Sequence, residues 1–522
     1  MVRPIPFTIR TIRAGRCYSD IMQDPESIFL LTKMEERLDN MKIKTNINMF
    51  QLAFFAFLLL CLGSCYKDKG NYDINMPITP EIIGLDTLYE AVVGDSLIIE
   101  PRFEGIDANQ LEFLWNIMVP ESINPERDLY EGPSLRMLFG YGAKVYTTRL
   151  TITNKSNGMK YFHNFKIRGI TEFSRGDVVL SIEQGITKLS FVKPDNTVQP
   201  NIYETINGEN LPADPLHLYF MRHTGLTNAT PLGYWIVTKN GGVRIDVDDL
   251  GLEKEKPNTI RDNFFLAPAT IEIGNLQNHP NGVLIGVING KFYGGTMQTW
   301  DQANTYGMFS NYADGNYELA PQFIMSTIDG NTIMIAYEKD KKQFVRLNIY
   351  GIPMYFGTQY TPIDPEIFDP HNVGMDLLDI VQINNTETYA YMKDATGNIY
   401  ELKFKCDFIK DFTFTSEHKR LFIHQEWINA DTKMVATQTG NIYIAAQNKV
   451  YRYNPINQQI REMETTFTDK VTMLKLDDDE NTLIAGAEGS IYYMDINVGR
   501  NGDLVKKIEG IPGTPVDMAW RK

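Results

Sequence analysis

Apolar and polar residues alternate along most of this chain in short runs separated by Gly, Asn and Asp. A period of two predicts β-strands with one buried and one exposed face, whereas the 3.6-residue apolar spacing of amphipathic helices is almost absent. In the stretch VYTTRLTITNKSNGMKYFHNFKIRG, two such runs flank residues 154–158, whose Asn-Gly pair readily adopts positive φ. The pattern therefore predicts an all-β protein.

Residues 80–170 contain five short alternating runs, at 85–93, 96–103, 111–118, 144–153 and 160–170. Trp115 lies in the third run, where the core of a β-sandwich would accept a large ring. About 90 residues with this spacing favour an immunoglobulin-like sandwich. The pattern Tyr146-x-x-x-Leu150-x-Ile152-Thr153 resembles the late strands of PKD domains, but the Gly-Asp-Gly turn that often follows their tryptophan is missing after Trp115.

Residues 171–522 show a longer repeat. Three copies align closely, Thr396-Gly-Asn-Ile-Tyr400, Thr439-Gly-Asn-Ile-Tyr443 and Glu488-Gly-Ser-Ile-Tyr492, each between two apolar runs. Four looser copies start near Asp177, Gly233, Asn281 and Asn331. Seven units over about 350 residues predict a seven-bladed β-propeller, with six or eight blades as alternatives. The final run, residues 515–520, is expected to close the ring by pairing with the first blade, which removes two exposed sheet edges.

The segment before the sandwich is typical of an export signal. Met41-Lys-Ile-Lys44 provides a short basic start, and the apolar run of residues 49–62 is too short for a membrane span of roughly 20 residues. Leu62-Gly-Ser-Cys65 resembles the bacterial lipobox, which implies cleavage before Cys65 and acylation of that cysteine. An uncleaved anchor helix and an ordinary signal with a chance cysteine are the alternatives.

The predicted organisation follows from that cleavage. Residues 1–40 are a mis-assigned upstream start without ordered structure, residues 41–64 are the lipoprotein signal peptide, and residues 65–79 are the lipidated cysteine and its tether. Residues 80–170 form the sandwich and residues 171–522 the propeller. Of the later residues only Cys406 retains a free thiol, so no disulfide framework and no cysteine zinc site is expected.

The order of lipobox, sandwich and propeller, together with the stretches CYKDKGNYD and GYWIVTKNGG, resembles the PKD-like lipoprotein family of Bacteroidota. That resemblance implies an outer-membrane lipoprotein, lipid-anchored on the cell surface or the periplasmic face. Such proteins often accompany nutrient-uptake systems that import glycans. The resemblance transfers no catalytic residues.

Charge narrows the choice of partners. The chain has 50 basic and 65 acidic residues; residues 1–64 hold 8 and 6 of these, so the rest carries 42 and 59, or about −17. This balance argues against nucleic acid as a partner.

Motifs for catalysis are not found: the chain has no G-x-S-x-G elbow, P-loop or H-E-x-x-H helix, and nothing predicts a cofactor. The pairs His217/His223 and His418/His424 are six residues apart, which places each pair on one face of a strand, but no third metal ligand is evident. The acidic run of residues 477–481 reads as a solvated hairpin turn, with ion binding as the alternative. We therefore assign no catalytic residue and no metal site.

The stretch of residues 293–322 is the strongest binding candidate. It combines Tyr293, Trp300, Tyr306 and Tyr312 with amides and carboxylates, and flat rings beside amides suit sugars as well as protein partners. Packing of these rings onto the propeller is the alternative. Trp427 marks a second, fainter candidate.

These observations favour a non-catalytic binding protein for a glycan or an uptake-system partner. The alternatives are a propeller glycoside hydrolase or lyase, with carboxylates or His217 and His223 at the central channel, and a scaffold subunit of an outer-membrane complex.

Overall fold

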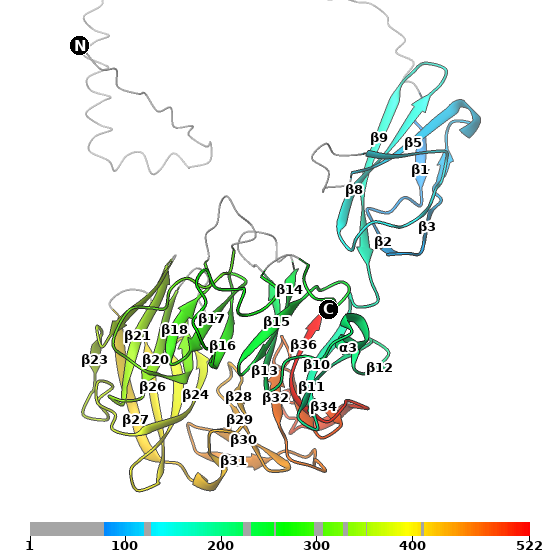
Figure 1. Ribbon diagram of the computed structural model, residues 1–522. Coiled ribbons are helices and arrows are strands. Elements are labelled where there is room, and N and C mark those ends of the chain that lie inside the picture. The colour runs from blue at the N-terminus through cyan, green and yellow to red at the C-terminus, as the bar shows by residue number, and fades with distance from the viewer. Residues whose placement is uncertain are drawn as a thin grey trace, which may run out of the picture. The chain divides into compact units, whose positions relative to one another are not determined.

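The computed structural model describes residues 78–118, 127–222, 231–254, 257–296, 306–326, 332–350, 352–408 and 412–521. In these ranges the chain is almost entirely β-strand, as predicted, and forms a sandwich followed by a propeller (Figure 1). The short non-strand elements there are the α-helix α3 (Ile202–Asn207) and the 3-10 turns η2 (Ala108–Gln110) and η4 (Gln425–Trp427).

The sandwich contains a five-stranded sheet in the order β2-β9-β8-β5-β6 and two smaller pairs, β3-β7 and β1-β4. Its strands are β1 (Glu81–Ile83), β2 (Leu88–Val92), β3 (Ser96–Ile99), β4 (Arg102–Glu104), β5 (Leu111–Met118), β6 (Arg127–Glu131), β7 (Leu135–Leu138), β8 (Val145–Asn154) and β9 (Lys160–Ile170). β2 pairs in parallel with β9, and the other neighbours in the large sheet are antiparallel.

The alternation seen in the sequence becomes the core of this sandwich. Along β8, every second residue from Tyr146 to Ile152 is buried, and the intervening ones are more exposed. Trp115 is fully buried as predicted; its indole N–H donates to the Gly132 carbonyl at 2.8 Å, and its ring meets Phe165 edge-on at 5.9 Å. The indole thus fills the core without leaving its polar atom unpaired.

Within the described residues, seven sheets follow the sandwich, which confirms the predicted blade number. The first three blades comprise β10 (Gly176–Glu183), β11 (Ile186–Val192) and β12 (Val198–Gln199), joined by the last strand of the chain, β36 (Thr514–Arg521); then β13 (Pro215–Arg222), β14 (Pro231–Thr238) and β15 (Gly241–Ile245); then β16 (Ile273–His279), β17 (Val283–Ile288) and β18 (Lys291–Gly294). The fourth blade comprises β19 (Leu319–Met325), β20 (Ile333–Glu338), β21 (Gln343–Tyr350) and β22 (Ile352–Gly357), and the fifth comprises β23 (Thr361–Ile363), β24 (Asp376–Asn384), β25 (Glu387–Lys393), β26 (Ile399–Cys406) and β27 (Thr413–Leu421). The sixth blade comprises β28 (Met434–Ala436), β29 (Ile442–Ala446), β30 (Lys449–Asn454) and β31 (Gln459–Glu462), and the seventh comprises β32 (Met473–Leu476), β33 (Thr482–Ala487), β34 (Ser490–Asp495) and β35 (Asp503–Glu509).

The ring of blades closes through the last strand, as predicted. β36 pairs antiparallel with β10, for example Ala519 opposite Val178, so that the C-terminal strand completes the first blade. The innermost strands β36, β13, β16, β19, β24, β28 and β32 each contact the next one, and β32 returns to β36. Closure leaves no inner edge open to a second chain.

The three closely aligned copies of the repeat do not occupy equivalent places in their blades. Gly397 and Gly489 occupy the turn between the second and third strands of their blades, with φ of 94° and 70°. Gly440 has the same positive φ, 90°, but lies between the first and second strands, β28 and β29. The same tight-turn chemistry serves either hairpin, so the local motif does not specify its place in a blade.

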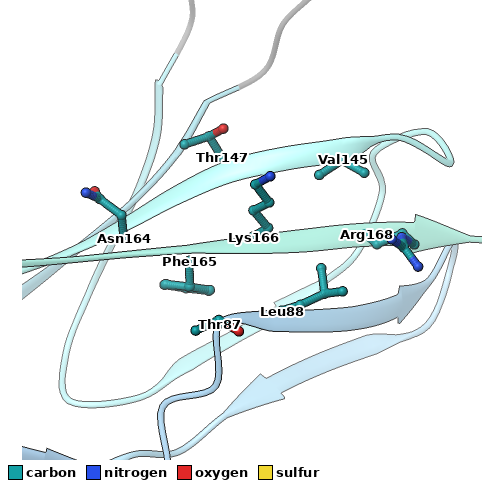
Figure 2. Close-up of a pocket in the computed structure, with 8 residues that line it drawn as sticks. All are labelled: Thr87, Leu88, Val145, Thr147, Asn164, Phe165, Lys166 and Arg168. Atoms are coloured by element: carbon teal, nitrogen blue, oxygen red, sulfur yellow. The ribbon is translucent and has the colours of Figure 1, made fainter. Parts of the chain in front are cut away.

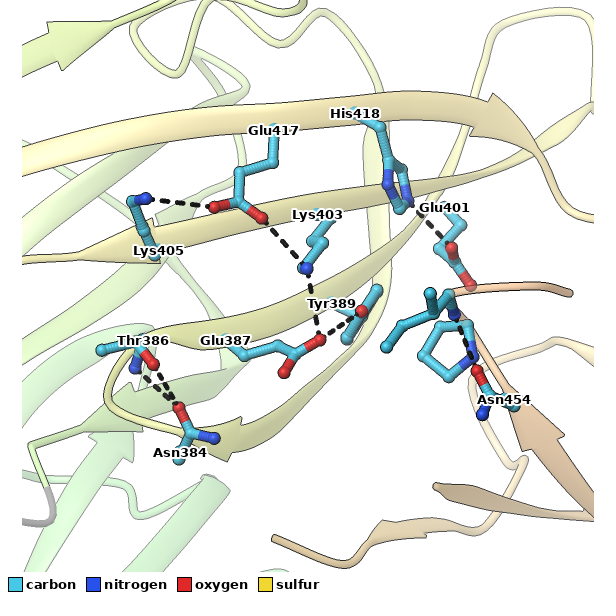
Figure 3. A network of polar contacts seen from close by, with 12 residues as sticks. Asn384, Thr386, Glu387, Tyr389, Glu401, Lys403, Lys405, Glu417, His418 and Asn454 are labelled. Atoms are coloured by element: carbon cyan, nitrogen blue, oxygen red, sulfur yellow. Dashed lines mark hydrogen bonds and ion pairs between the residues drawn. The ribbon is translucent and has the colours of Figure 1, made fainter. Parts of the chain in front are cut away.

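A network of charged side chains covers the fifth blade (Figure 3). The Lys403 ammonium lies 3.2 Å from the Glu387 carboxylate and 3.0 Å from that of Glu417. Glu401 lies on β26, the same strand as Lys403, and is fully buried. Its carboxylate contacts His418 Nε2 at 2.9 Å and Arg420 Nη2 at 2.6 Å. A buried carboxylate persists only when it is paired in this way.

Candidate binding site in the propeller channel

The inner strands are held to one another by side chains that reach neighbouring backbones. Tyr219 Oη donates to the Leu276 carbonyl at 2.5 Å, which links β13 to β16. Other links join the next strands in the same way: Gln277 Nε2 to Phe323 O at 3.3 Å, Gln322 Nε2 to Leu378 O at 3.1 Å, Gln382 Nε2 to Met325 O at 2.8 Å and Thr472 Oγ1 to Pro515 O at 2.7 Å. Hydrogen bonds from polar side chains therefore hold these inner strands to their neighbours along the channel.

Four polar residues of the inner strands each follow a break in strand register. The extra residues are Leu216 on β13, Gly274 on β16, Leu378 on β24 and Val516 on β36. The residues that directly follow them are His217, Asn275, Asp379 and Asp517. A β-bulge turns the next side chain away from its regular face, so the four bulges account for these polar groups at the channel.

Asp517 is the most constrained member of this set. Its carboxylate accepts from the Leu218 backbone N–H at 2.7 Å and from Lys475 Nζ at 2.6 Å, and it lies 3.9 Å from His217 Nδ1. Its side chain is 9% exposed, whereas that of His217 is 35% exposed. Asp517 thus joins three inner strands, β36, β13 and β32.

The pKa of the His217 imidazole is lowered from its ordinary value. Burial lowers its pKa, the cations Lys475 and Lys433 lower it further, and Asp517 and a hydrogen bond to Asn275 oppose the shift. Lys433 and Lys475 belong to the sixth and seventh blades and His217 to the second, so charges from across the ring influence one group.

Asp379 is the second carboxyl at the channel. Burial raises its pKa to about 7, while the Ile380 N–H, which donates to it at 2.8 Å, and the cation of Lys433 act in the opposite direction. A carboxyl group that is half-protonated near neutral pH can both donate and accept a hydrogen bond. We name His217, Asn275, Asp379, Lys433, Lys475 and Asp517 the channel belt.

A pocket of about 460 Å³ opens at the C-terminal ends of the inner strands, and we name it the mouth pocket. It is lined by Leu218, Tyr219, Phe220, Arg222, Asn278, Pro280, Lys475, Asp478, Met518, Ala519 and Trp520. The Trp520 indole N–H donates to Asp478 at 2.9 Å, and Lys475 Nζ lies 5.9 Å from the indole centroid. Its volume and its mixture of rings, cations and amide match a small-molecule site.

The aromatic stretch predicted from the sequence lies partly inside the propeller. Tyr293 is 6% exposed and packs against Phe264 and Phe309, whereas Tyr312 is 43% exposed and meets Tyr293 edge-on at 5.8 Å. Tyr306 is half-buried, and its hydroxyl donates to the carbonyl of Asn281, the residue after a mouth-pocket proline. Trp300 lies outside the described residues.

Trp427 lies in a stack of three rings. Its indole packs on His424 at 3.9 Å with an interplanar angle of 5°, and on Tyr451 at 4.1 Å with an angle of 20°. It also lines a small cavity of about 70 Å³ beside Lys433 of the channel belt. The structure does not bring Trp427 together with the predicted tyrosines: Tyr293 packs between the second and third blades, and Tyr306 packs against the cluster formed by the third and fourth.

The histidine pairs separate in the structure. His217 belongs to the channel belt and His223 lies outside the described residues, while His418 contacts Glu401 and His424 stacks on Trp427. Within the described ranges, no three His, Cys, Asp or Glu residues converge tightly enough to hold a metal ion. Cys406 is buried with a free thiol, and burial raises its pKa well above the ordinary value.

The N-terminal predictions fall outside the described residues, which include neither Cys65 nor residues 1–64. No helix in the described part of the chain is long and apolar enough to cross a membrane.

Sequence reasoning missed most of the channel. Trp520 was placed only in a ring-closing strand, and Asp379, Asp517, Lys433 and Lys475 were not selected. The position of Trp520 near the end of the closing strand was the signal in the sequence that could have indicated a channel residue. The closing strand becomes an inner strand of the propeller, and inner strands line the channel.

One family of known proteins matches the N-terminal part of this chain. Residues 65–215 match the model of a PKD-like family, a range that begins at Cys65 and covers less than a third of the chain. None of the curated proteins matches the chain.

Solved structures from Bacteroides thetaiotaomicron resemble the chain at low identity. A quinonprotein alcohol dehydrogenase-like protein aligns with 85% of this chain and 99% of its own at 13% identity and a TM-score of 0.38. The extracellular domain of a one-component system aligns with 75% of this chain and 67% of its own at 12% identity and a TM-score of 0.18. Because both TM-scores lie below 0.5, they indicate nothing about ligand or activity.

Proposed function

We propose that this protein is a lipid-anchored, non-catalytic glycan-binding protein of the bacterial outer membrane, and that the mouth pocket is its binding site. The observation that carries the proposal is the pocket itself, about 460 Å³ with rings of Tyr219, Phe220 and Trp520 beside amide and charged donors. Sugar rings present C–H faces that pack on aromatic side chains and hydroxyls that bond to such donors.

The location of the pocket supports this proposal. It lies at the end of the channel where the inner strands of four blades meet, so a closed ring of sheets fixes its walls. Rigid walls reduce the conformational entropy that the protein loses when a ligand binds. Tyr306 contacts the backbone beside this pocket through Asn281, which supports a contribution from the predicted aromatic stretch.

The experiment is affinity electrophoresis of the purified protein in gels that contain single polysaccharides, with wild type compared with Trp520→Ala. We expect retardation on at least one neutral glycan and its loss in the variant. The matched control is Trp427→Ala, which removes a stacked indole from the other candidate binding site, outside the mouth pocket. If wild type is retarded and Trp520→Ala is retarded equally, the mouth pocket is not the site.

The second candidate function is a propeller hydrolase or lyase, and Asp379 favours it. A carboxyl group whose pKa is raised to about 7 is suited to general acid catalysis. Release of new reducing ends from a retarded glycan, lost in Asp379→Asn, would replace binding by catalysis as the conclusion.

A further inference from the structure

The outward face of β8 and β9 in the sandwich is basic. Because side chains alternate along a strand, residues 145, 147, 149, 151 and 153 of β8 share this face with residues 160, 162, 164, 166 and 168 of β9, to which they are paired. The set is Val145, Thr147, Arg149, Thr151, Thr153, Lys160, Phe162, Asn164, Lys166 and Arg168. It includes four cations and no carboxylate, in a chain with a formal net charge of −15.

These cations are only partly neutralised by the protein. Arg168 lies 3.4 Å from Glu90 on β2. Arg149 Nε donates to the amide oxygen of Asn164 at 2.8 Å, and its guanidinium lies 5.5 Å from the ring centroid of Phe162. Among the described residues, neither Lys160 nor Lys166 forms an ion pair, so charge remains available on this face.

The same face contains a shallow groove of about 520 Å³. Figure 2 shows Asn164 and Lys166 of β9 beside Thr147 and Val145 of β8. Its lining comprises Thr87, Leu88, Val145, Thr147, Asn164, Phe165, Lys166 and Arg168. Hydroxyl and amide groups therefore alternate with cations and aliphatic groups inside one groove.

Exposed apolar side chains continue the groove along the strands. Phe162 is 55% exposed, Val145 45% and Leu88 39%. β9 has 11 residues and spans about 35 Å at the usual rise of a strand. A ligand that uses the whole face is therefore an extended chain.

We propose that the β8–β9 face binds an extended anionic polysaccharide, carboxylated or sulfated. The cations face the acidic groups, the threonine and asparagine side chains bond to hydroxyls, and Phe162, Val145 and Leu88 pack against the apolar faces of the sugars. Charge complementarity selects an anionic ligand over a neutral one, and the linear arrangement selects a polymer. This site lies on the sandwich and does not depend on the mouth pocket.

The test measures binding of the full chain to polygalacturonate and to dextran sulfate by isothermal titration calorimetry. Methyl-esterified polygalacturonate and dextran serve as neutral counterparts with the same backbones. We expect binding to at least one anionic polymer, no binding to its neutral counterpart, and weaker binding when NaCl rises from 50 to 500 mM, because salt screens exposed charges.

The double variant Arg149→Glu, Lys166→Glu should weaken binding about tenfold or more, since two attractions become repulsions. Arg102→Glu reverses one exposed cation on β4, away from this face, and should leave binding within about twofold of wild type. Trp520→Ala should also leave it unchanged, so loss at one site is distinguishable from loss at the other. Matching thermal unfolding curves establish that the variants are folded.

Three results would overturn the proposal. The first is wild-type affinity in the double variant, and the second is equal binding of charged and neutral polymers. The third is binding to vesicles that contain anionic phosphatidylglycerol without binding to either anionic polysaccharide, which would assign the face to a membrane surface.

Discussion

Replacing Asp379 by asparagine should stabilise this protein at alkaline pH and not at acidic pH. The carboxyl group has an ordinary pKa of 3.8, and burial at the channel raises its pKa to about 7. Between these values the folded chain retains a proton that the unfolded chain has lost. The contribution of this group to the free energy of unfolding therefore falls as pH rises from about 4 to about 7 and is constant above that.

The magnitude follows from the same two values. One pKa unit corresponds to 1.36 kcal/mol, so the full shift would cost the folded state about 4 kcal/mol at pH 8. Asp379 is half-buried and faces the channel, where water screens its charge, so we expect an effective cost of about 1–2 kcal/mol. Asparagine keeps the size and the oxygen that accepts the Ile380 N–H and removes the charge.

The assay is urea denaturation of wild type and Asp379→Asn at pH 4.5, 6 and 8. The free energy of unfolding of the variant should exceed that of wild type by about 1–2 kcal/mol at pH 8 and by less than about 0.5 kcal/mol at pH 4.5. Asp376→Asn, on the same strand with a side chain 65% exposed, is the matched control and should show no such pH dependence. A gain of equal size at all three pH values would refute the reasoning, as would destabilisation at pH 8.

Two further outcomes test other parts of the chain. Glu401→Ala leaves Arg420 without its buried carboxylate and should lower the free energy of unfolding, measured by urea titration, by about 3 kcal/mol. Glu417→Ala removes a carboxylate from a side chain that is 28% exposed and should lower it by less than about 1 kcal/mol. Equal effects of the two substitutions would contradict the distinction between buried and partly exposed ion pairs. Cys65→Ser should abolish incorporation of an alkyne-labelled fatty acid. It should also move the protein from the membrane fraction to the soluble fraction after ultracentrifugation, because the lipid is the proposed anchor. Labelling that persists in this variant would exclude Cys65 as the acylation site.

Much of the fold could be predicted because β-structure leaves a period of two in the sequence. β8 shows it directly, with buried residues at every second position from Tyr146 to Ile152. Turn chemistry was equally readable, since Gly397, Gly440 and Gly489 all adopt positive φ. The repeat motif did not reveal that Gly440 lies one hairpin earlier in its blade than the other two glycines, because a glycine turn reports local backbone conformation and not which two strands it joins.

The candidate site could be predicted only in part. Aromatic composition directed attention to Tyr293, yet 6% exposure places its ring among buried neighbours. The binding role of that stretch stays a prediction. Burial of a ring depends on what lies opposite it, and composition contains no record of that.

The sequence by itself determined that this chain forms strands, that seven similar units follow a sandwich, and that a final strand remains to close the ring. These are consequences of local periodicity and turn preference, which act over a few residues. Only the tertiary structure decided which polar side chains meet at the channel. Asp379 and Asp517 belong to blades far apart in the sequence, and each follows a one-residue bulge that turns it inward. A bulge is defined by how a strand pairs with its partner, so its position belongs to the assembled sheet and not to the period-two pattern of one strand.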